Sequence, residues 1–201
     1  SKNILYEYGL DVPRYGVASS PTEAISLGDV IGYPLVLKGR GIAHKTESCA
    51  VKVGLNSSSD LKAALSEMDV QNYLVEEMVS NAVCELLIGV IRDPVYGFVL
   101  TLAAGGVMAE LLGDQVSQIL PVKREDVTQA LQSLKICKVL MGYRGNSAVE
   151  LDPIIDAVLA VQSYVIDNVN EVEEVEINPL IATPERAIAV DALIRKGDYD
   201  G

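Results

Sequence analysis

Apolar residues along the chain follow two spacings, which predict a mixture of helices and strands. Apolar positions three and four residues apart, as at Leu61, Ala64, Leu65 and Met68, predict amphipathic helices. Short apolar runs between glycine, proline or polar turn residues predict strands. We expect helices at residues 4–9, 20–31, 59–68, 124–141 and 152–168. We expect strands at residues 34–38, 50–55, 73–79, 85–92, 95–102, 107–112, 116–122, 172–177 and 187–194.

Turn and capping residues set the boundaries of several of these elements. Ser20 followed by Pro21 and Glu23 has the pattern of a capping box, with proline in the first helical turn. Consecutive strands between residues 73 and 102 are joined too tightly for parallel crossovers, so they should pair antiparallel. We expect the two closing strands to be joined through Asn178-Pro179. The sequence therefore predicts an α+β fold with largely antiparallel sheets.

Composition and charge narrow the classes of protein. The 201 residues are 49% hydrophobic and 22% charged, which is typical of a globular chain of one large domain or two small lobes. A net charge of −12 argues against nucleic acid as a partner, although local cations can still hold a phosphate ligand. No apolar run approaches the roughly 20 residues that span a bilayer, so we expect no membrane association. Three widely spaced cysteines fit a reducing cytoplasm.

The segment from Gly39 to Leu55 carries the first candidate for chemistry. It contains His44, the only histidine of the chain, followed by Lys45. Neutral imidazole can attack a phosphoryl group, and nearby lysines can neutralise the charge that moves. A solvated loop histidine without a catalytic role is the alternative. The residues of this loop alone do not decide between the two.

Four further positions have both a functional and a structural interpretation. Lys38 lies at the end of an apolar strand. Its ammonium group either binds nucleotide phosphates or prevents aggregation at a sheet edge. Glu76 and Glu77 interrupt an apolar strand. They either offer backbone and carboxylate groups to a nucleotide, or they lie at the margin of the sheet with one carboxylate exposed. Arg144 lies in a loop flanked by glycines. Its side chain either binds an anion or is simply exposed to solvent.

Two pairs of residues suggest phosphate and metal binding. Gly105-Gly106 would allow the backbone to approach a phosphate, or it forms an ordinary turn. Asn178 and Asp191 terminate or interrupt neighbouring predicted strands, so their oxygens could converge on Mg²⁺. The alternative is a turn asparagine and an exposed aspartate.

Taken together, these motifs resemble the ATP-grasp domain of ADP-forming acyl-CoA synthetases, relatives of the succinyl-CoA synthetase β subunit. The similarity covers nearly the whole chain in the same order. The motifs are residues 8–13, 31–38, 43–47, 77–79, 85–90 with Asp93-Pro94, 105–107 with Glu110, 142–145, 176–180 and 191–192.

The resemblance implies a fold and a set of site residues. It implies one ATP-grasp domain over residues 1–201, whose lobes at about 18–75 and 76–196 clasp ATP or ADP with Mg²⁺. His44 would carry a phosphoryl group, with Lys45 and Arg144 as the other catalytic residues, and Asn178 and Asp191 would hold the metal. The nucleotide-binding residues would be Lys38, Glu76, Glu77, Met78, Glu85, Gly105 and Gly106.

The resemblance also implies a reaction: acyl-CoA + ADP + phosphate ⇌ carboxylic acid + ATP + CoA, through phosphohistidine. CoA would be a substrate of the complete enzyme. The CoA-binding and ligase domains have no counterpart here, so we expect this chain, which begins at Ser1, to come from a longer protein or to be one subunit of an oligomeric, cytoplasmic enzyme. Cys49 and Ala103 stand where the family tends to have glycine, and both should stiffen loops near phosphate.

Two other functions compete with this one. The first is a non-catalytic regulatory or interaction module, such as the ATP-grasp-like domains that accompany protein lysine acetyltransferases. The presence of Lys38, His44, Asn178 and Asp191 favours the enzyme over such a module. The second is a different ATP-grasp ligase, which the histidine loop and the Gly142–Gly145 motif disfavour.

Overall fold

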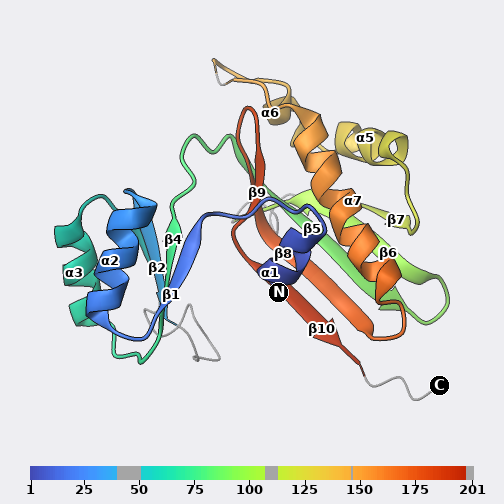
Figure 1. Ribbon diagram of the computed structural model, residues 1–201. Helices are drawn as coiled ribbons and strands as arrows, with labels where there is room; N and C mark the ends of the chain where they lie inside the picture. The colour runs from blue at the N-terminus through green and yellow to red at the C-terminus, as the bar shows by residue number, and fades with distance from the viewer. Residues whose placement is uncertain (40–50, 107–112, 146, 198–201) are drawn as a thin grey trace. The chain divides into compact units, whose positions relative to one another are not determined.

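The protein is an α+β structure in which every sheet pairing found is antiparallel, as the sequence predicts (Figure 1). The computed structural model describes residues 1–39, 51–106, 113–145 and 147–197. The chain divides into two compact units. The smaller is Pro13–Val79, and the larger combines Ser1–Val12 with Ser80–Gly201.

The smaller unit is a four-stranded sheet with two helices packed against it. The strand order is β1-β4-β2-β3. The elements are β1 Tyr15–Ala18, α2 Pro21–Ile31, β2 Leu35–Gly39, β3 Val51–Leu55, α3 Ser58–Glu67 and β4 Tyr73–Glu77. Burying the apolar faces of both helices against alternate strand residues stabilises the unit.

One strand and one capping detail of the smaller unit differ from the prediction. Strand β1 was not predicted, because a four-residue run containing Gly16 carries little strand signal. A Cβ at Gly16 would lie 2.8 Å from the side chain of Leu27, so glycine lets β1 and α2 approach closely. Ser20 accepts the Glu23 amide as expected, but the Glu23 carboxylate accepts from the amide and hydroxyl of Ser19.

The larger unit has a sheet of order β10-β8-β5-β6-β7, with β9 paired to β8. The strands are β5 Cys84–Asp93, β6 Gly97–Ala104, β7 Gln115–Ile119, β8 Val172–Ala182, β9 Ala187–Ala189 and β10 Ala192–Lys196. The helices are α1 Lys2–Glu7, α5 Arg124–Ser133, α6 Cys137–Leu140 and α7 Leu151–Asp167. Figure 1 shows the long helix α7 running along one face of this sheet.

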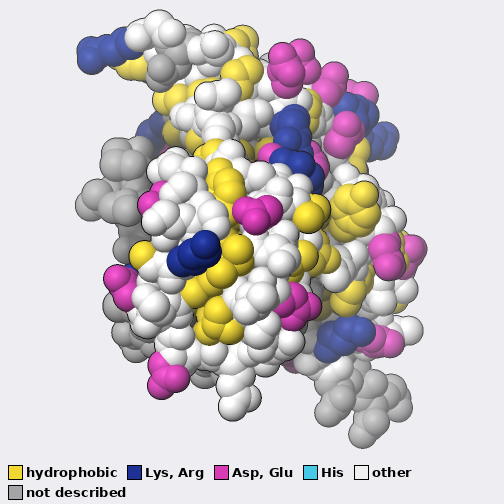
Figure 2. All heavy atoms as spheres, turned by 60° about the vertical axis from the view of Figure 1, so that its left-hand side comes forward, with side chains coloured by type: hydrophobic (Ala, Val, Ile, Leu, Met, Phe, Trp, Pro, Cys, Tyr) yellow, Lys and Arg dark blue, Asp and Glu magenta, His cyan; other side chains and the backbone are white. Residues whose placement is uncertain are grey.

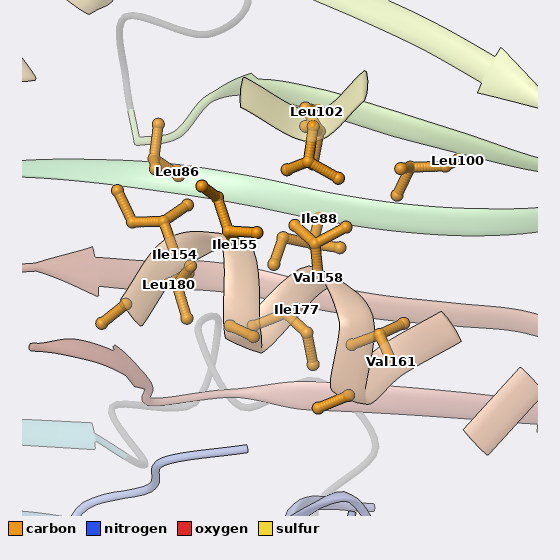
Figure 3. Packing of buried hydrophobic residues seen from close by; sticks show 14 of the residues in the cluster. Leu86, Ile88, Leu100, Leu102, Ile154, Ile155, Val158, Val161, Ile177 and Leu180 are labelled. Carbon is orange, nitrogen blue, oxygen red and sulfur yellow. The ribbon is translucent and has the colours of Figure 1, made fainter. Parts of the chain in front are cut away.

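The core of the larger unit lies between α7 and the sheet. Side chains of β5, β6 and β8 point toward α7 and meet its apolar face (Figure 3). The labelled residues are Leu86, Ile88, Leu100, Leu102, Ile154, Ile155, Val158, Val161, Ile177 and Leu180, and all are 3% exposed or less. The apolar face of this sheet is therefore covered by α7.

The expected helix 124–141 is wrong, because α5 ends at Ser133 and α6 begins at Cys137. Asp114, which is buried, accepts hydrogen bonds from the amides of Lys135 and Ile136 at 2.7 Å each. These amides therefore bond to a carboxylate instead of to the preceding helical turn. The break results from a contact between segments 21 residues apart.

The closing strands also differ from the prediction. Asn178-Pro179 lies inside β8 and does not join two strands. The expected strand 187–194 is divided into β9 and β10, with Val190 and Asp191 between them. Because Pro179 has no amide hydrogen, regular pairing is interrupted at this point of the sheet.

The unit boundaries differ from the expected lobes of 18–75 and 76–196. Strand β1 pairs with β4, so the smaller unit begins at Pro13. The first twelve residues belong to the larger unit, where Leu5 and Leu10 are fully buried in its core. The predicted strand 107–112 lies outside the described residues. Within the described part of the chain, no helix has the length and apolar character needed to cross a membrane.

Candidate functional site

Lys38 and Glu76 form an ion pair in the smaller unit. They lie on the neighbouring strands β2 and β4, and the Lys38 Nζ is 2.5 Å from the Glu76 Oε2. Lys38 alternates with the buried residues Leu35 and Leu37, so it lies on the sheet face opposite the helices. The side chains of Lys38 and Glu76 are only 14% and 2% exposed. The pair therefore holds an ammonium group at a defined place on this face.

The end of β4 is held on both sides. The Glu77 amide donates to the Arg14 carbonyl at 2.8 Å, and the Met78 amide donates to the Pro34 carbonyl at 3.0 Å. The Glu77 carboxylate also accepts from the Arg14 Nε at 2.9 Å. Residues 77–78 thus form a fixed, extended segment of the kind that presents backbone groups to a ligand.

In the larger unit, Gly105 and Gly106 pack directly against Glu85. The Gly105 amide donates to the Glu85 carbonyl at 2.7 Å, and a Cβ at Gly105 would lie 2.9 Å from the backbone of Glu85. Gly106 has φ of 68°, and a Cβ there would lie 2.6 Å from the Glu85 Oε2. Glycine is needed at both positions for this approach.

One expectation next to this turn changes in the structure. Ala103 was expected to stiffen a loop, but it lies within β6, buried and paired with Leu87 and Gln115. Its methyl group therefore does not affect a phosphate loop. Beside Glu85, burial first and the Glu85 carboxylate second raise the pKa of the Cys84 thiol from 9.0 to about 11. Cys84 is consequently a neutral thiol at physiological pH.

Asn178 and Asp191 are adjacent, as the sequence predicts from their places in two neighbouring strands. The Asn178 amide faces the Asp191 carbonyl at 3.4 Å, and both residues are exposed. The Asn178 Nδ2 donates to the Glu176 Oε1 at 3.2 Å, which leaves its Oδ1 as an acceptor. One amide oxygen and one carboxylate fit Mg²⁺, which takes one or two protein oxygens when it is bound with nucleotide phosphates.

Glu176 contacts this pair but is not among the site residues expected from the sequence. Its alternation with Asn178 along β8 is the signal that could have found it, because residues two apart in a strand share a face. Among the described residues, no group of three His, Cys, Asp or Glu side chains could hold a metal ion. A cation at Asn178 and Asp191 would therefore need ligands from water or from a bound nucleotide.

The remaining predicted residues are placed separately. His44 and Lys45 lie outside the described residues. Arg144 is an exposed turn residue of the larger unit with φ of 50°, and its guanidinium lies 5.2 Å from the centre of the Tyr143 ring. Lys38, Glu76, Glu77 and Met78 belong to the smaller unit, whereas Glu85, Gly105, Gly106, Asn178 and Asp191 belong to the larger unit.

The comparison with protein families is decisive, since residues 1–195 match the family described as the ATP-grasp domain. The chain belongs to the ATP-grasp family. This confirms the resemblance seen in the ordered motifs. It also places the antiparallel α+β architecture within a known fold.

Relatives of this ATP-grasp chain include ADP-forming CoA ligases. The β subunit of acetate–CoA ligase [ADP-forming] I from Pyrococcus furiosus is 29% identical over 204 residues, which cover 96% of this chain and 88% of that subunit. Acetate–CoA ligase [ADP-forming] I of Archaeoglobus fulgidus is 30% identical over 189 residues. That match covers 88% of this chain but only 27% of the longer protein.

A solved structure of similar fold is acetyl-coenzyme A synthetase 1 of Candidatus Korarchaeum cryptofilum. Its complex with coenzyme A, Ca-AMPCP and HgCl⁺ has a TM-score of 0.90 and 30% identity, covering 98% of this chain and 90% of that chain. A second complex of that protein, with coenzyme A and Mg-AMPPCP, has a TM-score of 0.83, 29% identity and the same coverage. In that complex a phosphohistidine segment points towards the nucleotide-binding site.

Proposed function

We propose that this ATP-grasp chain is the nucleotide-binding and phosphoryl-transferring part of an ADP-forming acyl-CoA synthetase. The complete reaction is acyl-CoA + ADP + phosphate ⇌ carboxylic acid + ATP + CoA, and this chain performs only its nucleotide half. The adjacency of Asn178 and Asp191 carries the proposal, because two exposed oxygen ligands, one on β8 and one between β9 and β10, suit a magnesium nucleotide. The Mg-AMPPCP complex of the related synthetase supports the same ligand class.

The residues of the two units have complementary roles in this proposal. Lys38, oriented by Glu76, binds the phosphates as a point charge. Glu77 and Met78 receive the base and ribose, and Glu85 with the Gly105-Gly106 turn supplies further nucleotide-binding groups. Asn178 and Asp191 would hold Mg²⁺, which would neutralise charge on the nucleotide phosphates. The protein's own contribution is therefore mainly orientation and charge compensation.

His44 is the proposed acceptor of the transferred group. An imidazole nitrogen attacks the γ-phosphorus of ATP, the bond from that phosphorus to the bridging oxygen breaks, and ADP leaves with the bond's electron pair. Lys45 and Arg144 neutralise charge during this transfer. In the reverse direction, the phosphoryl group returns to ADP from His44.

The complete enzyme requires further domains in this proposal. The match to a β subunit supports such domains in a partner subunit, and the match to 27% of a longer relative supports them in the same chain. We place the oligomeric enzyme in the cytoplasm, away from membranes and nucleic acid. On the face shown in Figure 2, basic side chains are spread among acidic and apolar ones. Together with the net charge of −12, this supports small phosphate ligands over a polyanion.

Asp191→Asn tests the proposed metal site. The variant should raise the Kd for ATP about tenfold or more in Mg²⁺, because a neutral amide replaces the charged ligand, and should leave the Kd in EDTA unchanged. Isothermal titration calorimetry with and without Mg²⁺ measures both values. Glu171→Gln is the matched control, since it removes an exposed carboxylate of the same unit that pairs with Lys196. An equal loss in EDTA would contradict the metal role of Asp191.

A further inference from the structure

Arg14 and Glu77 lie beside the two points where the chain enters and leaves the smaller unit. The unit begins at Pro13 and ends at Val79. Regular pairing of β1 with β4 stops at Tyr15 and Glu76. One residue further, the Glu77 amide still donates to the Arg14 carbonyl at 2.8 Å. The two connections of the unit are therefore joined at this residue pair.

The side chains of this pair extend the connection. The Arg14 Nε donates to the Glu77 Oε2 at 2.9 Å, and the Arg14 amide faces the same oxygen at 3.4 Å. The Glu77 carboxylate is thus turned back onto Arg14, with 28% of the Glu77 side chain exposed. A guanidinium suits this role because its charge is permanent and its planar donors fix direction.

The segment held by Arg14 is the one that the proposed function assigns to the base and ribose. The Met78 amide is fixed on the other side by the Pro34 carbonyl at 3.0 Å. The contact between Met78 and Pro34 is made by backbone atoms, so a substitution at Arg14 does not remove it. Such a substitution removes only the contact of the Arg14 side chain with Glu77. A segment that binds a ligand must be held within about 0.5 Å of the productive position, and a side chain that contacts the segment can hold it there.

We infer that Arg14 is a positioning residue for the base and ribose end of the nucleotide, acting through Glu77 and Met78. The inference rests on the proposed function. An exposed ion pair contributes little to folding, so removing it should leave the unit folded. The loss should instead affect ligands that contact residues 77–78. Contacts of the phosphates with Lys38 and with Mg²⁺ should remain.

The test compares ATP with inorganic tripolyphosphate, which has the phosphates but neither base nor ribose. Arg14→Met should raise the Kd for ATP in Mg²⁺ about threefold, which is the factor expected for loss of an exposed ion pair. The Kd for tripolyphosphate should be unchanged. Lys52→Met should change neither Kd. This control removes the exposed Lys52–Glu67 pair, 2.7 Å long, from the same unit. Calorimetry measures both Kd values, and thermal melting checks that each variant is folded. A second variant, Arg14→Gln, should give the same result.

Each remaining outcome overturns a stated claim. An unchanged Kd for ATP in a folded Arg14 variant overturns the positioning role alone. An equal loss for ATP and tripolyphosphate also overturns it, because the change would then not be confined to the base and ribose end. A wild-type protein that binds neither ligand in Mg²⁺ overturns the proposed function together with this inference.

Discussion

His44→Asn is expected to abolish transfer of the γ-phosphoryl group from ATP to this chain, by a factor of about 1,000 or more. Asparagine is close in size and polar but has no basic nitrogen that can attack phosphorus. Affinity for ATP in Mg²⁺ should stay within about tenfold of wild type, because the proposed role is acceptor and not anchor. The predicted effect is therefore on the chemical step alone.

Radiolabelled ATP measures this transfer directly. Phosphohistidine is labile in acid and stable in base, and the chain contains one histidine, so a label with this behaviour that His44→Asn removes is assigned to His44. Calorimetric titration of the variant serves as the control for binding. If such a label remains after His44→Asn, or if the wild-type label is stable in acid, another residue accepts the phosphoryl group.

Lys38→Met is expected to weaken both folding and nucleotide binding. The substitution leaves the buried Glu76 carboxylate without its lysine partner, which should cost about 3 kcal/mol of the free energy of unfolding. It also removes the proposed phosphate-binding charge, so the Kd for ATP in Mg²⁺ should rise at least about tenfold. Urea denaturation and calorimetry measure the two effects.

A double substitution separates the two roles of Lys38. Lys38→Met with Glu76→Gln removes both charges, so most of the lost stability should return because no unpaired charge stays buried. Nucleotide affinity should remain low, since the phosphate contact is still absent. Recovery of both properties in the double variant would show that Lys38 acts on nucleotide only through folding.

The sequence predicted elements whose signals are local. Helix α2 follows from Ser20, Pro21 and the apolar periodicity after them, and α7 from its closely spaced apolar face. The break between α5 and α6 could not be predicted, because it depends on the buried Asp114 from a different part of the chain. The division of strand 187–194 depends likewise on its pairing opposite Pro179.

In the candidate site, too, contacts between residues far apart in the sequence could not be predicted. Asn178 and Asp191 could be paired from sequence, because oxygen-bearing residues interrupted two strands that were expected to be neighbours. Alternation placed one of Glu76 and Glu77 away from solvent, but it could not identify Lys38 as the partner of Glu76. Arg14 gave no signal, since it is exposed and its contact with Glu77 joins residues 63 positions apart.

Calorimetric titration of the wild-type protein with ATP, in Mg²⁺ and then in EDTA, tests the central claim most directly. Binding of roughly micromolar Kd that weakens at least about tenfold in EDTA is the result that a magnesium-nucleotide site at Asn178 and Asp191 predicts. Binding that is the same with and without Mg²⁺, or absent at millimolar ATP, would contradict it.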